Sequence, residues 1–156
     1  MSQSRVRREA ADSLTGLLLP LADRNLLLPN VVVAELIPYR APTPFEGMPG
    51  WVLGQVAWRE LRLPLLSFEA VCGGRPVLGA APRIAVLNAL GGRAQVKFIA
   101  LLVQGIPRSV RLDTDLARST GALHPLELDA VQVGEIEARI PDLVGLEEKL
   151  AQAGLL

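Results

Sequence analysis

Aromatic residues, cysteine, histidine and net charge are all scarce in this chain of 156 residues. Aromatics make up 4 % of the composition and hydrophobic residues 50 %, so the core must be built mainly from Leu, Val, Ile and Ala. The 16 basic and 16 acidic residues cancel, which removes an overall electrostatic attraction to nucleic acid or to an anionic membrane. No apolar run reaches the roughly 18 residues of a membrane-spanning helix. We therefore expect no nucleic-acid partner and no direct membrane insertion.

The single cysteine and the single histidine limit the chemistry that the chain can perform. Cys72 has no partner for an internal disulfide, which is typical of a reducing compartment, and the opening residues lack a signal-peptide cleavage site. We therefore expect a cytoplasmic protein. One His and one Cys cannot complete a closed zinc site, and no cofactor is expected. A Ser67–His124–Asp129 triad is disfavoured because Ser67 lacks a Gly-x-Ser-x-Gly elbow, so we predict that the protein is not an enzyme.

Short apolar segments separated by Gly, Pro, Asn and Asp predict a chain of strands. Residues 1–12 are polar and charged and are expected to form a loose tail or a short helix, with 13–156 as the folded domain. Many short strands and one terminal helix indicate an all-β barrel or sandwich. The predicted strands are 14–21, 25–29, 35–39, 52–59, 61–66, 83–89, 97–103, 109–112, 130–133 and 137–140.

Helix signals are few and lie between these strands. Asn30 is placed to cap a turn over residues 31–35, and Ser67 to cap a single turn that ends at Val71. Residues 114–128 have no clear pattern and are predicted to be a loop. The final helix begins after Pro141-Asp142. Its apolar stripe is expected to be Leu143, Val144, Leu146 and Leu150, with Glu147, Glu148 and Lys149 facing water.

The segment from Gly54 to Leu66 carries the most information about function. Alternation along a strand places Trp58 and Arg59 on opposite faces, with Trp58 in the core. Pro64 lacks the N–H that a β-ladder needs, so its strand is expected near a sheet edge, where a partner can bind. Arg59 is either a solvated turn charge or an interfacial anchor that pairs with a carboxylate.

This segment, together with residues 36–40 before it, resembles the core of the CheW-like coupling domains of bacterial chemosensory systems. In that family a Gly-apolar-apolar-Asn-apolar-Arg-Gly turn is followed by an apolar-Pro-apolar strand, to which Gly54–Glu60 and Leu63–Leu65 correspond here. The resemblance covers about residues 14–152. It implies an all-β fold of two small five-stranded β-barrels packed around a shared hydrophobic seam, with a short C-terminal helix.

The resemblance also implies partners and binding residues. CheW-like proteins are non-catalytic scaffolds that join the tip of a methyl-accepting chemoreceptor to a CheA-type histidine kinase, and we expect the same role here. In the family an Arg at the position of Arg59 tends to pair with a Glu, which is Glu35 in this chain. The protein-binding residues expected by matching position are Val33, Glu35, Gly54, Arg59, Ile84 and Ile106.

Four departures from the family pattern refine this expectation. Ala57 replaces the usual Asn, Glu60 the usual Gly, and Ser67 and Gln104 stand where Asp is common. Such divergence resembles the accessory coupling proteins of pilus-type systems, so a role in type IV pilus twitching motility is expected. The alternative is a small β-barrel that binds a small ligand or peptide outside chemosensing.

Overall fold

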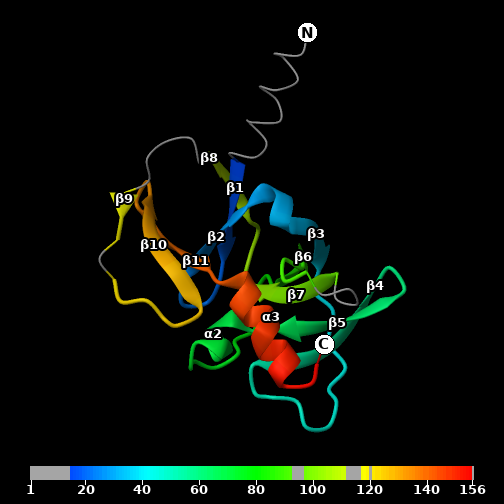
Figure 1. The fold of residues 1–156 in the computed structure, drawn as a ribbon. Coiled ribbons are helices and arrows are strands. Elements are labelled where there is room, and N and C mark those ends of the chain that lie inside the picture. The colour runs from blue at the N-terminus through cyan, green and yellow to red at the C-terminus, as the bar shows by residue number, and fades with distance from the viewer. Residues whose placement is uncertain (1–14, 93–96, 112–116, 120, 156) are drawn as a thin grey trace.

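The computed structural model describes residues 15–92, 97–111, 117–119 and 121–155, and the predicted tail over 1–12 lies outside them. The strands form two sheets (Figure 1). The first sheet has the order β8-β1-β2-β11-β10-β9, and the second has the order β3-β6-β7-β5-β4. The first comprises β1 (Thr15–Pro20), β2 (Asn25–Pro29), β8 (Arg108–Arg111), β9 (Ala117–Arg118), β10 (Glu127–Val133) and β11 (Ile136–Pro141). The second comprises β3 (Val33–Pro38), β4 (Val52–Trp58), β5 (Leu61–Leu66), β6 (Arg83–Asn88) and β7 (Phe98–Val103).

The two sheets share their largest core. The cluster contains Leu19 and Leu26 from the first sheet and Leu101 from the second, all with no exposed surface. Each sheet also has a smaller cluster of its own, and neighbouring residues of one strand enter different clusters: Leu18 packs inside the first sheet and Leu19 in the shared seam. Strands covered on both faces read as continuous apolar runs. The expected two barrel-like subdomains around a hydrophobic seam are therefore confirmed, although β9 gives the first sheet a sixth strand.

Within the described residues, three helical segments connect or cover the sheets. They are η1 (Asn30–Val32), α2 (Phe68–Val71) and α3 (Leu143–Gln152). Ser67 caps α2 as predicted, because its hydroxyl accepts the Ala70 N–H at 3.2 Å. The predicted cap at Asn30 is wrong: Pro29 occupies the cap position of η1 without a side-chain bond, and Asn30 is already helical.

Helix α3 packs on the shared seam through Leu143, Leu146 and Leu150. Two predictions about its faces are wrong. Val144 is 41 % exposed rather than part of the apolar stripe. Glu147 is fully buried rather than solvated, because the helical period places it on the same face as Leu143 and Leu150.

Two further sequence predictions are corrected by the sheet order. Residues 114–128 contain β9 and the start of β10 instead of only a loop. Pro64 lies on β5, which has β7 and β4 as neighbours, so its strand is not an edge. The registered partners of β7 on β5 are Leu65 and Leu66, and on that side Pro64 is therefore not required to donate an N–H.

Candidate protein-binding site

The β4–β5 turn places Arg59 on the surface above Trp58. Arg59 and Glu60 have positive φ values of 46° and 64°, so neither continues the strand. The guanidinium carbon of Arg59 lies 4.5 Å from the centroid of the Trp58 ring, a cation–π contact. The predicted placement of Trp58 and Arg59 on opposite faces is wrong, because the alternation rule applies to extended residues and Arg59 is in a left-handed turn.

Glu35 on β3 meets this turn from the opposite edge of the second sheet. Arg59 Nη2 lies 3.1 Å from Glu35 Oε1, as the predicted pairing requires. The Trp58 indole N–H donates to the same oxygen at 3.0 Å. Because β3 and β4 are the two edge strands, these bonds close the sheet into a barrel-like form.

Exposure separates the roles of the three side chains. Trp58 is 6 % exposed and packs edge to face on Phe98 at 4.7 Å between ring centroids, so its predicted core position is confirmed. The side chains of Arg59 and Glu35 are 67 % and 40 % exposed. An ion pair so exposed adds at most about 1 kcal/mol to stability, so stability alone does not account for it.

Sequence reasoning missed the indole bond, although a signal existed. A buried tryptophan needs an acceptor for its N–H, and Glu35 is the carboxylate that the motif already brought to Arg59. The bond from the buried indole holds the Glu35 carboxylate from the core side, while Arg59 contacts the same carboxylate from the solvent side.

Val33 and Gly54 both lie in close contact with other parts of the fold. Val33 is half-buried at the start of β3 and packs against the shared seam. Gly54 is buried with φ +139°, and an added Cβ would lie 2.6 Å from the Thr43 carbonyl oxygen. Gly54 therefore lets the loop before β4 cross close to the strand, where Thr43 pairs with Gln55. Their part in partner binding stays a prediction.

The last two expected residues lie apart from the Glu35–Arg59 pair. Ile84 has no exposed surface and packs in the core cluster of the second sheet, so it has no area to offer a partner directly. Ile106 is 69 % exposed and follows the far end of β7, whereas Phe98 at the near end contacts Trp58. Six strand residues span about 20 Å, so the six expected residues do not form one surface.

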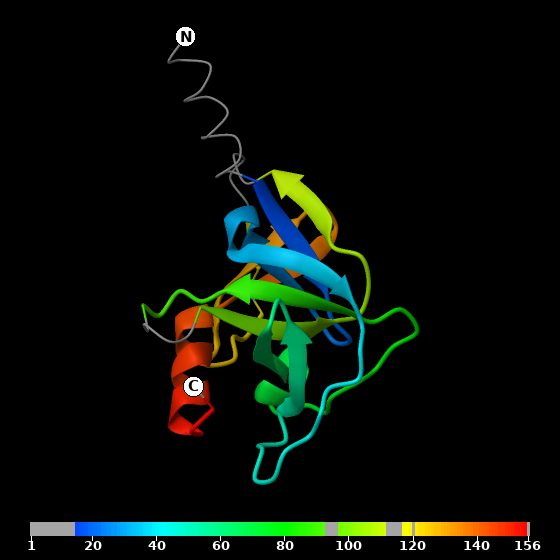
Figure 2. The same ribbon diagram turned by 90° about the vertical axis from the view of Figure 1, so that its right-hand side faces the viewer.

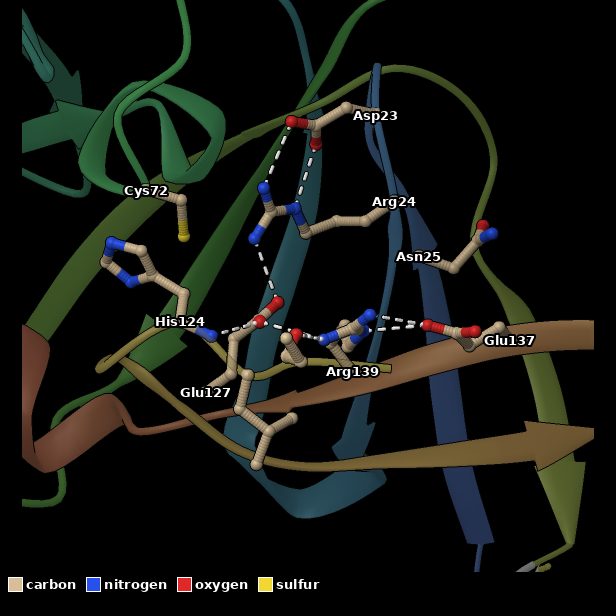
Figure 3. A pocket seen from close by; sticks show the side chains of 10 residues that line it. Asp23, Arg24, Asn25, Cys72, His124, Glu127, Glu137 and Arg139 are labelled. Atoms are coloured by element: carbon tan, nitrogen blue, oxygen red, sulfur yellow. Dashed lines mark hydrogen bonds and ion pairs between the residues drawn. The ribbon is translucent and has the colours of Figure 1, made fainter. Parts of the chain in front are cut away.

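A separate polar cavity of about 500 Å³ opens beside the β1–β2 turn (Figure 3). At its centre the buried Glu127 carboxylate accepts hydrogen bonds from Arg24 at 2.8 Å and Arg139 at 3.1 Å. Arg24 also forms two bonds to Asp23, and these raise the pKa of its guanidinium. Both arginines are thus occupied by carboxylates, and the cavity favours no anionic ligand.

Cys72 and His124 line the same cavity without forming a reactive pair. Burial raises the pKa of the Cys72 thiol, and the positive charge of Arg24 only partly opposes this. The Nδ1 atom of His124 accepts the Leu126 N–H at 3.2 Å. Ser67 bonds within the α2 cap, and Asp129 pairs with Arg118, so the three residues of the disfavoured triad are bonded elsewhere. Within the described ranges, no three His, Cys, Asp or Glu side chains are placed to hold a metal ion.

Comparisons with known proteins agree on one fold. The model of the CheW-like domain family matches residues 15–143. Among solved structures, the chain is similar to the scaffolding protein TtCheW from Thermoanaerobacter tengcongensis, with a TM-score of 0.70 and 15 % identity over 84 % of this chain and 85 % of that chain. No curated protein matches the chain. In the part of the chain that the structure describes, no helix has the length and apolar character needed to cross a membrane.

Proposed function

The chain belongs to the CheW-like domain family, and from this premise we propose that it is a non-catalytic chemosensory scaffold. In this proposal it couples the tip of a methyl-accepting chemoreceptor to a CheA-type histidine kinase in the cytoplasm. Residues 13–156 act as one binding domain, and 1–12 as its tail. The observation that carries the proposal is the exposed Arg59, which the fold holds in a fixed position at the β4–β5 turn.

The geometry at Arg59 supports a role in recognition. Among the described residues its acceptor is Glu35, reached through one nitrogen, so the other N–H groups of the guanidinium face solvent. Contact with the Trp58 ring and with Glu35 restricts the long side chain before a partner arrives. A preorganised arginine loses less conformational freedom on binding than a free one, and its planar fork matches a carboxylate.

The departures from the family pattern support the finer assignment to pilus-type signalling. Ala57 and Glu60 alter the residues on either side of the Trp58-Arg59 pair and therefore alter what a partner meets. We propose that this domain serves a chemosensory system that controls type IV pilus twitching motility. Binding to the kinase and receptor of such a system, compared with those of a flagellar system, tests this point.

The central test is a charge reversal at Arg59. Purified protein is titrated separately with a CheA-type kinase and with a receptor helical-hairpin tip, by calorimetry. We expect Arg59→Glu to weaken receptor binding at least tenfold, about 1.4 kcal/mol, while kinase binding is kept. Arg118→Glu is the matched control, because Arg118 is 82 % exposed on β9 of the other sheet.

Two results contradict the proposal. One is that the wild-type protein binds neither kinase nor receptor. The other is that Arg59→Glu lowers the melting temperature by many degrees, which identifies Arg59 as a structural residue.

A further inference from the structure

The polar cavity beside the β1–β2 turn is assembled from separate parts of the chain, which are that turn, the end of α2, the segment that leads into β10, and β11. Its volume of about 500 Å³ is typical of a small-ligand pocket. Of its described lining residues, none is expected to bind a protein partner. Most of the lining belongs to the first sheet, which lies above the second sheet in Figure 2 (β1 in blue, β6 and β7 in green). A ligand site here does not depend on the proposed function.

A chain of ion pairs holds the walls of the cavity in place (Figure 3). The guanidinium of Arg24 is bonded to Asp23 and to the buried Glu127. Arg139 connects the same Glu127 to Glu137, and it also donates to a backbone carbonyl of the segment before β10 at 2.7 Å. Side chains that are already fixed lose little conformational freedom when a ligand binds.

The charges in this chain of ion pairs favour a ligand without charge. Each arginine is bonded to two carboxylates, so neither is available to neutralise an anion. Both guanidiniums meet at the buried Glu127, so positive charge lies where a cation would need a carboxylate. The side chains of Asp23 and Glu137 are 45 % and 42 % exposed, and solvent and salt screen their attraction for a cation.

The lining offers hydrogen-bond donors and acceptors together. Each nitrogen of Arg24 makes one of the bonds above, which leaves an N–H on Nη1 and another on Nη2. The Nδ1 atom of His124 accepts the Leu126 N–H, so the neutral ring carries its proton on Nε2. The carboxylates of Asp23 and Glu137 are acceptors at the rim. A hydroxyl group matches this mixture, because the same oxygen both donates and accepts.

The apolar part of the lining is aliphatic. It consists of Ala122 and Leu123, and Leu123 is 45 % exposed. No Phe, Tyr or Trp side chain is among the described residues that line the cavity. Flat heteroaromatic ligands such as nucleobases gain much of their affinity by stacking on such rings. The lining therefore favours a ligand with an aliphatic carbon skeleton.

Shifted pKa values gather at this cavity. Burial raises the pKa of the Cys72 thiol, and hydrogen bonds from Ser119 and Arg139 lower the pKa of the Glu137 carboxyl. The bonds to Asp23 raise the pKa of the Arg24 guanidinium. Shifted titratable groups that share one cavity are typical of functional sites.

We propose that this cavity binds a small uncharged compound with several hydroxyl groups, such as a monosaccharide or a cyclic polyol. Arg24 and His124 donate hydrogen bonds to its oxygens. The carboxylates of Asp23 and Glu137 accept its O–H groups, and Leu123 contacts its carbon-bound hydrogens. Because the ligand joins the β1–β2 turn to the segment before β10, its binding also stabilises the folded state.

Matched sugars test the charge preference with the full chain. Glucose, galactose and mannose are each compared with the amino sugar and the uronate of the same configuration, which keep the ring and change its charge, and myo-inositol represents the cyclic polyols. Amide NMR signals are followed during each titration. We expect at least one neutral compound to shift the signals of residues 22–25 and 121–127 saturably. A neutral sugar that binds is expected to do so about tenfold more tightly than its charged counterparts.

Cys72 provides a local readout, because it lines the cavity. At a probe concentration ten times the dissociation constant, we expect alkylation by iodoacetamide to be about tenfold slower, since only the unliganded protein reacts. The control is the urea-unfolded chain, whose alkylation rate the same probe is expected to leave unchanged.

Two pairs of variants locate the bound compound. Ala122→Trp places a large side chain at the cavity and is expected to weaken binding about tenfold, whereas Ala117→Trp on β9 is expected to leave it unchanged. Asp23→Asn removes a charged partner of Arg24, so we expect the uronate to gain affinity relative to the neutral sugar. Asp129→Asn, at a carboxylate outside the cavity, is the matched control. Melting temperatures near that of the wild type establish that the variants are folded.

Four results would overturn the proposal. One is that no neutral compound binds, and another is that a charged sugar binds as tightly as the neutral sugar of the same configuration. The third is that a bound probe leaves the alkylation rate of Cys72 unchanged. The fourth is that Ala117→Trp weakens binding as much as Ala122→Trp. Kinase and receptor binding enter none of these measurements, so failure of the proposed function would be recognised separately.

Discussion

Two consecutive non-glycine residues with positive φ close the β4–β5 hairpin. Two-residue hairpin loops of this kind require left-handed conformations at both central positions, which Asn and Gly adopt most readily. Glu60, at φ 64°, stands where the family pattern has Gly. An L-residue in this region costs about 1–2 kcal/mol, so the departure stores strain at the turn that presents Arg59.

Replacing Glu60 by Gly relieves that strain. We expect Glu60→Gly to raise the free energy of unfolding by about 1 kcal/mol and the melting temperature by about 2–4 °C. Ala57→Gly, three residues earlier on β4 where φ is not positive, is expected to lower stability by about 0.5–1 kcal/mol. Urea unfolding measures both. A neutral or destabilising Glu60→Gly would contradict the strain argument.

The pH dependence of Cys72 alkylation tests whether burial at the polar cavity raises the pKa of its thiol. Because burial raises the pKa of the folded thiol above its unfolded value, we expect alkylation by iodoacetamide to reach half its maximal rate at a higher pH than in the urea-unfolded chain. The raised pKa also makes the free energy of unfolding depend on pH. The stabilising contribution of the protonated Cys72 thiol is fully present below the unfolded pKa and is lost as the pH rises through the folded pKa.

The control for this experiment is Cys72→Ser, which removes the reaction. An alkylation midpoint equal to or below that of the unfolded chain would show that the thiol is more solvated than its surroundings indicate.

At the scale of elements, helix α3 fastens the loop after β6 as well as covering the seam. The buried Glu147 carboxylate accepts the N–H of Leu90 at 2.7 Å and that of Gly91 at 3.0 Å. Two backbone donors that have no strand partner are therefore satisfied by a side chain from the last helix. The 3.6-residue period puts position 147 on the face of Leu143 and Leu150, but only the contact with this loop explains why a carboxylate is buried there.

The neighbouring positions Glu147 and Glu148 form a matched pair for testing this anchor. Glu147→Gln places amide hydrogens against at least one of the two donors, so we expect a loss of about 1–3 kcal/mol in the free energy of unfolding. Glu148→Gln, on the exposed side, is expected to change it by less than about 0.5 kcal/mol. Equal effects at both positions would contradict the anchoring role.

The whole molecule is organised around the seam that both sheets share. Residues from β1 and β2, from β6 and β7, and from α3 occupy one cluster, so neither sheet has a complete core without the other. The turn after β1 adds a polar link, since the Ala22 N–H donates to the buried Glu69 of α2 at 3.0 Å. We therefore expect the two barrel-like subdomains to unfold together.

Leu146→Ala tests this coupling from helix α3, which packs on the seam beside the two sheets. Leu146 has no exposed surface, and its truncation is expected to cost about 2–5 kcal/mol. Trp58 reports on the core of the second sheet and Trp51 on the shared seam by fluorescence, while far-UV circular dichroism reports on the whole chain. The two transitions are expected to coincide in the wild type and in the variant. Separate transitions would identify two independently stable units.

The sequence by itself determined the strands other than β9 and the start of β10, the α2 cap and the start of α3, because these follow from local period, turn residues and side-chain chemistry. The resemblance of its motif to the family predicted the twin barrels. It also paired Glu35 with Arg59, through the family motif. Only the tertiary structure decided that the Trp58 indole supports this pair, that Glu147 is buried and that Ile106 lies far from Arg59. Each of these depends on strands and loops distant in sequence, and the hydrophobic period of one element does not tell where another element lies. The same limit applies to Gln104, whose side-chain amide bonds to Gly79 and Val77, 25 and 27 residues earlier in the sequence.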